Sequence, residues 1–457
     1  MKKVKTTIFA MTLCFVVQAQ SAVKLSLDSC RQLAIKENKE LRMAAMKQRA
    51  AHYERRAAQT KYLPRVSASG AYLHTSRELS LLSGEQKASL SALDDKLGGL
   101  GSQLVEALHT DTRNMGAAAV MLSQPIYMGG KIVAYNRITR FAEQIARSQN
   151  DLALQNVIVE VDEAYWHIVA LRSKKALAEG FLQLVEKLDS DVQQMIAEGI
   201  ATTADGLSVR VKVNEAKVAL IQVNNGLELS KMKLCQVCGL EMDTDVEPTD
   251  ELPQQSAALV TSAYHDVQTA FGNRPELRAL DLSTNIYKEK VNLARSEFLP
   301  SVALTGGYMA SNPSLFDSFE RQMKGMWSVG VVISVPIVTF GERCYKVKAA
   351  RAEQTIANYE LDETREKVEL QVNQCRRKLT EASERLTTAM QSMDEADENL
   401  RHATLGMKEG VIPVSNVLEA QTAWLGAHSQ CVEARVDVRL AEVYLEKAKG
   451  EVINFGR

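Results

Sequence analysis

Two segments of this chain share one pattern, a strand joined through a proline and a glycine to a long helix. The first is LSQPIYMGGKIVAYNR, residues 122–137, and the second is ISVPIVTFGERCYKVK, residues 333–348. Proline cannot donate to a strand ladder and is expected where the ladder ends, while glycine permits the change of backbone twist. The paired joint residues are Pro125 with Gly130 and Pro336 with Gly341.

Each joint is followed by almost seventy residues with hardly a helix breaker. Residues 131–198 and 342–409 contain no proline and one glycine each. At 1.5 Å per residue, each segment predicts a helix about 100 Å long. Return helices are expected over 205–238 and 415–449. Such helices are typical of an ordinary antiparallel coiled coil, but their attachment to strands favours a helical tunnel that continues a membrane barrel.

Self-comparison divides the chain into two collinear halves, 26–245 and 258–457. YLPRVSASGAY at 62–72 recurs as FLPSVALTGGY at 298–308, an offset of 236. Later motifs repeat at an offset of 211, so the first half carries 25 additional residues (236 − 211). They fall around 76–113, and insertions of that size belong in surface loops. We expect this loop to lie outside the cell.

Four segments of about ten residues have the alternation of transmembrane strands. They are predicted at 65–75, 116–126, 301–310 and 326–336. Lipid does not tolerate an open sheet edge, because unpaired backbone N–H and C=O groups cost several kcal/mol each. Four strands are too few to close a barrel, since the smallest closed membrane barrels have about eight. Several subunits must therefore share one barrel.

The N-terminus predicts export. Three lysines precede an apolar stretch from Ile8 to Val17 and small residues suited to cleavage, the pattern of a signal peptide spanning 1–19 or 1–22. No lipid-attachment motif surrounds Cys14 or Cys30, so the mature protein is expected to lack a lipid anchor. The formal net charge of −1 argues against a nucleic-acid partner.

A family resemblance rests on the motifs YLPRVSASG, FLPSVALTG, SQPIYMGG, SVPIVTFG, EGIATTADGL and EGVIPVSNVLEAQ. Through these motifs, the whole mature chain resembles the TolC-like outer-membrane efflux proteins. The resemblance implies a trimer in which three sets of four strands form a twelve-stranded β-barrel in the outer membrane. A hollow α-barrel would continue it across the periplasm. The implied function is an exit duct for efflux or type I secretion. The implied partners are a periplasmic adaptor and an inner-membrane pump of the RND, ABC or MFS type.

The turns after the long helices, at Gly199 and Gly410, are then the periplasmic tips. The resemblance places the entrance constriction at Asn416 and Glu419, which are three residues apart and share a helical face. A simpler alternative is that Asn416 caps a helix and Glu419 is a solvated acid in its first turn. Asp205 matches the acid that links the tips in relatives, and a capping role is its alternative.

This chain departs from its relatives at two positions. Where some relatives carry a tyrosine and an arginine that lock the tip, it has Met407 and Ile412. That lock is absent, and an apolar constriction is the alternative.

No enzyme or cofactor is expected, since the sequence contains no G-x-S-x-G, P-loop or H-E-x-x-H pattern. Cys235 and Cys238 have neither a second cysteine pair nor an adjacent histidine, whereas zinc sites usually have four ligands. We expect both cysteines to be small buried residues near a helix end, and no metal site. The rival function is a periplasmic coiled-coil adaptor or cell-envelope scaffold without a pore, which would have no lipid-facing strands.

Overall fold

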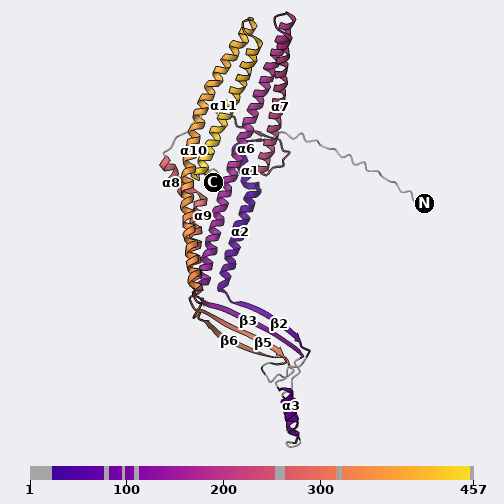
Figure 1. Ribbon diagram of the computed structural model, residues 1–457, viewed down its shortest axis with the longest axis vertical. Coiled ribbons are helices and arrows are strands. Elements are labelled where there is room, and N and C mark those ends of the chain that lie inside the picture. The colour runs from indigo at the N-terminus through magenta and orange to yellow at the C-terminus, as the bar shows by residue number, and fades with distance from the viewer. Residues whose placement is uncertain are drawn as a thin grey trace, which may run out of the picture. The chain divides into compact units, whose positions relative to one another are not determined.

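The computed structural model describes residues 23–76, 82–94, 98–107, 113–252, 263–314, 316 and 322–452. The predicted signal peptide lies outside these residues, as do parts of the predicted loop at 76–113. The fold is mainly helical, with long paired helices and a small antiparallel sheet (Figure 1). Within the described ranges, no helix combines the length and the apolar character needed to cross a membrane.

The helices are α1 (Leu27–Glu37), α2 (Lys39–Gln59), η1 (Thr60–Tyr62), α3 (Gly84–Ser91), α5 (Leu100–Ala107), α6 (Lys131–Ala197), α7 (Thr203–Cys238), α8 (Ala263–Asn273), α9 (Pro275–Ser296), α10 (Glu342–Lys408) and α11 (Val414–Lys449). The strands are β1 (Val23–Leu25), β2 (Arg65–His74), β3 (Asn114–Met128), β4 (Val246–Pro248), β5 (Ser301–Asn312) and β6 (Lys324–Ser334). All four predicted long helices and all four predicted transmembrane strands are present, with ends shifted by at most two residues.

Two compact units make up the chain. We call the first, Met1–Lys47 with Arg147–Arg278 and Asp362–Arg457, the helical unit. The second, Gln48–Ala146 with Ala279–Leu361, holds the four-stranded sheet and is the strand unit.

In the helical unit, α6 pairs with α7 and α10 pairs with α11 (Figure 1). α6 and α10 each have 67 residues, and α7 and α11 each have 36. The return helices also end alike, at Gly239 and Gly450, both with φ of +74°. Glycine suits this left-handed position because it has no Cβ to clash with the helix. The two halves therefore repeat the same helical hairpin.

The base of the helical unit is closed by a second core. Strand β1 pairs in parallel with β4, and α1 packs on α7. The Arg31 guanidinium of α1 makes a bidentate ion pair with Asp162 of α6, with N–O distances of 2.7 and 2.6 Å. Tyr165 of α6 donates to an Asp250 carboxylate oxygen at 2.5 Å. These contacts fix the N-terminal segment against the long helix.

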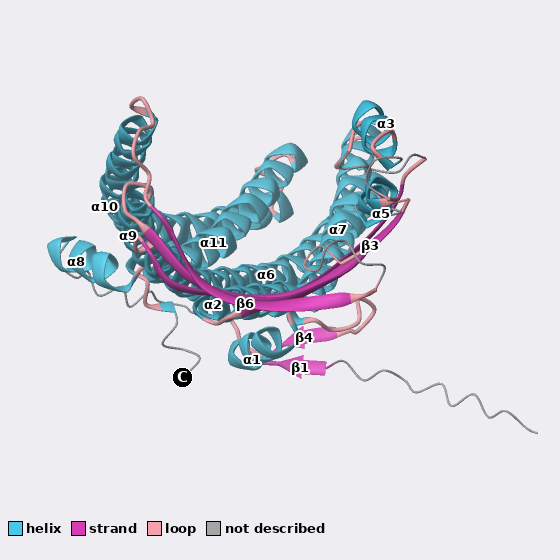
Figure 2. Ribbon diagram, turned by 90° about the horizontal axis from the view of Figure 1, so that it is seen from below, coloured by secondary structure: helices cyan, strands magenta, loops and turns pink. Residues whose placement is uncertain are grey.

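In the strand unit, one antiparallel sheet has the order β2-β3-β5-β6. Arg65 of β2 lies opposite Ser123 of β3, which lies opposite Thr305 of β5. Figure 2 shows the strands of this sheet as long curved bands. Within the described chain, β2 and β6 are the edges and each lacks a neighbour on its outer side.

Candidate functional site

The two predicted tip turns have the same backbone design. After α6, the N–H of Gly199 donates to Ile196 O at 3.0 Å, and the N–H of Ile200 donates to Met195 O at 2.8 Å. After α10, Gly410 and Val411 make the corresponding bonds at 3.0 and 2.9 Å. Both glycines have positive φ, +78° at Gly199 and +76° at Gly410. Glycine ends each helix here because other residues adopt this conformation only with strain.

Asn416 and Glu419 both lie on an exposed face of α11 just past the second tip. Pro413 is the N-cap residue of α11 and makes no side-chain capping bond. Asn416 lies inside the first turn, where its N–H donates to Pro413 O at 3.1 Å. The capping alternative for Asn416 is therefore wrong. Both side chains are exposed in the single subunit, which fits a solvated Glu419 as well as a constriction, so the constriction stays a prediction.

Asp205 has a local partner in the first tip. Its carboxylate accepts from the Thr202 N–H at 3.0 Å and the Thr202 hydroxyl at 2.6 Å, while the Asp205 N–H donates to Thr202 Oγ1 at 3.2 Å. This reciprocal pair is a capping box at the start of α7. The hydrogen bonds from Thr202 lower the pKa of the Asp205 carboxyl. The capping alternative for Asp205 thus describes its contacts within the subunit.

Met407 does not face outward. Its side chain is 2% exposed and packs in a core that α6, α7, α10 and α11 build below the tips. The Ile412 side chain packs against Gly406. A Cβ added at Gly406 would lie 2.5 Å from Ile412 Cδ1. In this subunit both residues stabilise the tip from within, so an apolar constriction made by Met407 is not what the structure shows.

One polar cluster below the second tip was not found from the sequence. Asp397 of α10 accepts from Trp424 Nε1 at 2.5 Å and lies 3.0 Å from His428 Nε2, both on α11. The Trp424 and His428 rings are 4.3 Å apart. The four-residue spacing on α11 was visible in the sequence, but the opposing acid lies 27 positions earlier. The cluster ties α10 to α11.

The two strand–helix joints differ from each other. Strand β6 ends at Ser334, two residues before Pro336 and before the predicted end at 336. Strand β3 instead continues past Pro125 to Met128, and its pairing with β5 shifts register between Pro125 and Tyr127. The prediction that Pro125 ends its strand is therefore wrong. At Pro125 the strand is paired with β5 alone, because its pairing with β2 ends at Ser123, and the register shift accommodates the missing N–H.

The glycines of the joints also have distinct tasks. Gly130 and Gly341 both have positive φ, +82° and +89°. Gly129, which the sequence analysis did not single out, has φ of +61°, and an added Cβ there would lie 2.5 Å from Ser296 O. The joint thus needs glycine at 129 for space as well as for conformation.

The two faces of the sheet have different chemistry. Residues that oppose one another, and alternate residues along a strand, share a face. One face is apolar and open, with side chains 58% to 75% exposed at Val66, Tyr72, Trp327, Val329, Val331 and Ile333. The other carries most of the hydroxyl side chains, including Ser67, Ser69, Ser123, Thr305 and Ser328, together with exposed apolar side chains at Leu73, Met121, Met309, Met326 and Val332. The continuous apolar character of the first face is what is expected of a lipid-facing surface, and the hydroxyl groups of the second face suit contact with water.

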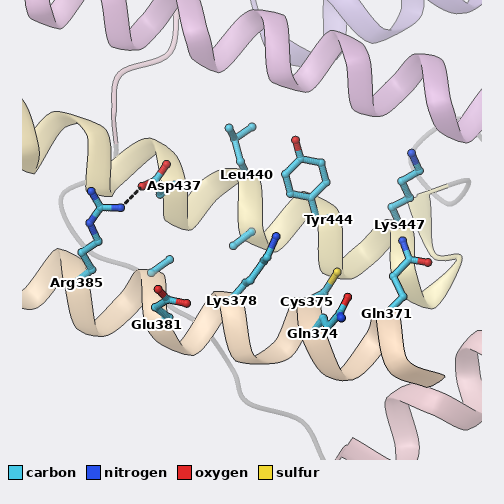
Figure 3. A pocket seen from close by; sticks show the side chains of 12 residues that line it. Gln371, Gln374, Cys375, Lys378, Glu381, Arg385, Asp437, Leu440, Tyr444 and Lys447 are labelled. Atoms are coloured by element: carbon cyan, nitrogen blue, oxygen red, sulfur yellow. Dashed lines mark hydrogen bonds and ion pairs between the residues drawn. The ribbon is translucent and has the colours of Figure 1, made fainter. Parts of the chain in front are cut away.

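A groove also lies between α10 and α11. Its cavity of about 720 Å³ is lined by both charges, including Lys378, Glu381 and the ion pair of Arg385 with Asp437 at 3.1 Å (Figure 3). Its lining therefore mixes positive and negative groups.

Cys235 and Cys238 are both fully buried, which confirms the prediction made for them. Cys30 of α1, which the sequence did not connect to them, lies in the same core, and the Cys238 thiol donates to Cys30 O at 3.6 Å. Among the described residues, no group of three or more histidine, cysteine or acidic side chains is placed to hold a metal ion.

The long helical hairpins and the two-faced sheet both agree with known proteins. Residues 30–240 and 267–451 match the family model described as outer membrane efflux protein. This chain belongs to that family. It is similar to the outer membrane protein TolC of Vibrio cholerae, with 22% identity over 342 residues that cover 73% of this chain and 76% of TolC. It is also similar to the alkaline protease secretion protein AprF of Pseudomonas aeruginosa, with 22% identity over 335 residues, 70% of this chain and 66% of AprF.

The fold of this efflux protein matches a solved channel. The Campylobacter jejuni CmeC outer membrane channel superposes with a TM-score of 0.77 at 15% identity, covering 93% of this chain and 85% of CmeC. Family membership makes the chain an outer-membrane efflux or secretion channel, as predicted from the sequence. Members of the family are not enzymes, which confirms the prediction that it catalyses no reaction.

Proposed function

We propose that three copies of this chain form one exit duct through the outer membrane. Each would add four strands to a closed twelve-stranded barrel, and the paired helices would form a hollow α-barrel in the periplasm. The observation that carries the proposal is a sheet with two open edges and one exposed apolar face. Lipid excludes open edges, so β6 of one subunit would pair with β2 of the next.

The second joint supports the same assembly. Ile337 and Phe340 are 90% and 99% exposed in the single chain. Large apolar side chains gathered at that exposure mark a surface that is covered by lipid or by another subunit. A pore-free adaptor or scaffold, the rival function, has no use for this surface.

The duct would work with an inner-membrane pump and a periplasmic adaptor, reached through the tips at Gly199 and Gly410. Its substrate would pass through water without chemical change. Secretion of a protein is one option, since the similar AprF is named for alkaline protease secretion.

The signal peptide would direct export, and the insertion at 76–113 would lie outside the cell. An epitope placed at Gly84 should then be reachable on intact cells, and labelling only after outer-membrane rupture would reverse this topology.

Two measurements test the proposed duct. Native mass determination of the detergent-extracted protein should give a trimer, and planar bilayers containing it should show discrete conductance steps. A monomer or dimer without conductance would refute the duct and favour the scaffold.

The entrance is tested separately at Glu419. Three Glu419 carboxylates would form a ring near the pore axis, attracting cations and repelling anions. Glu419→Lys should therefore lower the cation preference of the channel while trimer assembly stays intact. Glu395→Lys, the same charge change on an exposed position of α10, is the matched control. Unchanged ion selectivity in Glu419→Lys would place this carboxylate away from the constriction.

A further inference from the structure

A second cavity lies where strands meet helices in the strand unit. It measures about 470 Å³, and β2, β3, β5, α6, α9 and η1 contribute side chains to its wall. Three of these are cationic: Lys61, Arg65 and Lys131. None of its lining residues is acidic, in contrast to the mixed groove between α10 and α11.

The three cations are available to a ligand. Within the described residues, no carboxylate forms an ion pair with Lys61, Arg65 or Lys131. The Lys61 ammonium lies 3.4 Å from the centre of the Tyr135 ring, which holds it beside the cavity. Arg65 and Lys131 are exposed at its rim. Three positive charges at one opening attract an anion more strongly than scattered surface lysines do.

The rest of the wall is apolar. Pro125, Ile132 and Leu293 line it, and Pro125 lies opposite Ala303 in the sheet. A small inorganic anion would leave this surface in contact with water. An anion with a hydrocarbon body would bury it and gain about 25 cal/mol for each Å² removed from water.

The register of the sheet identifies the face on which this cavity opens. Arg65 lies opposite Ser123, and Ser123 is two residues from Pro125, so all three belong to the face that carries the hydroxyl side chains. The apolar face, which includes Val66 and Val329, is on the other side. The cavity therefore faces away from the surface expected to meet lipid.

We propose that this cavity binds amphiphilic anions, molecules with a sulfonate, carboxylate or phosphate head on a hydrocarbon body. That they arrive through the channel rests on the proposed function, whereas the binding itself does not. In a trimer the three cavities would form a cationic belt inside the duct, at the level where strands give way to helices. The positive charge of this belt selects for anions. The ring expected at Glu419 carries the opposite charge.

The first experiment measures binding by calorimetric titration of the full-length protein in a non-ionic detergent. Decanesulfonate should bind saturably, once per subunit, and more weakly as salt screens the cations. Methanesulfonate has the head alone, and decyltrimethylammonium has the tail with the opposite charge. Neither compound should bind saturably at this cavity. Equal binding of methanesulfonate or of decyltrimethylammonium would overturn the proposal.

The second experiment removes the charges. The triple variant Lys61→Gln, Arg65→Gln, Lys131→Gln should bind decanesulfonate at least about tenfold more weakly, since each exposed charge pair contributes up to about 1 kcal/mol. Lys290→Gln is the matched control, because Lys290 also lies over a tyrosine ring, 4.1 Å from the Tyr287 centroid, but does not line the cavity. Wild-type affinity in a triple variant that still assembles, or an equal loss in the control, would refute the site.

Membrane lipid is the other source of the same chemistry. The titration is therefore repeated in nanodiscs of phosphatidylglycerol and of phosphatidylcholine. Equal decanesulfonate affinity in both supports a cavity on the water-facing side. Competition by phosphatidylglycerol alone would show that lipid headgroups reach the cations and would overturn that assignment. Conductance is recorded in parallel, so binding without conductance would refute the proposed duct and leave the anion site standing.

Discussion

Replacing Arg31 with alanine should loosen the N-terminal helix from the long helix α6. The Arg31 and Asp162 side chains are 11% and 2% exposed, and both carboxylate oxygens of Asp162 accept from the Arg31 guanidinium. The variant leaves a buried carboxylate without its cation, which costs about 3–5 kcal/mol. Burial already raises the pKa of the Asp162 carboxyl, so the unpaired acid should take up a proton more readily still.

Cys30 provides an internal reporter of this loss, because it lies on α1 and is fully buried. Its thiol reacts with a soluble disulfide reagent only when α1 opens. A loss of about 3 kcal/mol corresponds to an increase in the labelling rate of roughly a hundredfold. Peptide mass mapping separates Cys30 from the exposed Cys344, which should label at once in every variant.

The control for this experiment is Arg42→Ala. Arg42 forms an ion pair with Glu37, and the Arg42 side chain is 60% exposed. Exposed pairs contribute about 0–1 kcal/mol, so Cys30 labelling should rise less than about fivefold. If Arg31→Ala labels Cys30 no faster than Arg42→Ala does, the buried pair does not hold α1 in place.

Three further outcomes follow from the tips and the joint. Met407→Ala should destabilise the tip core by about 2–5 kcal/mol through the cavity it leaves, and exposed Leu405→Ala should not, as measured by amide exchange in α10 and α11. The lowered pKa of Asp205 means that its stabilising contribution is present above its ordinary value of 3.8 and is lost as pH falls through the folded value. Exchange in the first turn of α7 should therefore accelerate at acid pH, and Asp205→Asn should abolish that pH dependence. Gly129→Ala should impair assembly of heat-stable protein more than Gly130→Ala, because only the first Cβ meets Ser296 O, and equal yields would contradict this account.

The helical part of the fold was readable from the sequence because its signals are local. The two segments free of proline predicted helices ending at 198 and 409, and the observed ends are Ala197 and Lys408. The following glycines adopt the left-handed conformation that stops a helix. The strands were found from their alternation, but the passage of β3 through Pro125 depends on a bulge against β5. Pairing partners far along the chain decide such a feature.

The candidate site was only partly readable for the same reason. The exposed face shared by Asn416 and Glu419 follows from helical spacing alone. The burial of Met407 depends on how four helices meet, and Arg31 and Asp162 are 131 positions apart. Likewise, the place of Cys30 beside Cys238 depends on α1 folding onto the end of α7. These contacts link segments with no periodic relation in the sequence.

The open edges of the sheet have a consequence for how the protein is made. An unpaired strand beside an exposed apolar face is a template for uncontrolled pairing with any other extended chain. In the proposed trimer these edges are paired only when three subunits meet. After export, the separate subunit is therefore exposed to aggregation and proteolysis until it assembles. The length of this exposure depends on subunit concentration, because assembly is a collision between copies. Cells that produce this chain slowly should therefore lose a larger fraction of it to proteolysis before it ever reaches the membrane.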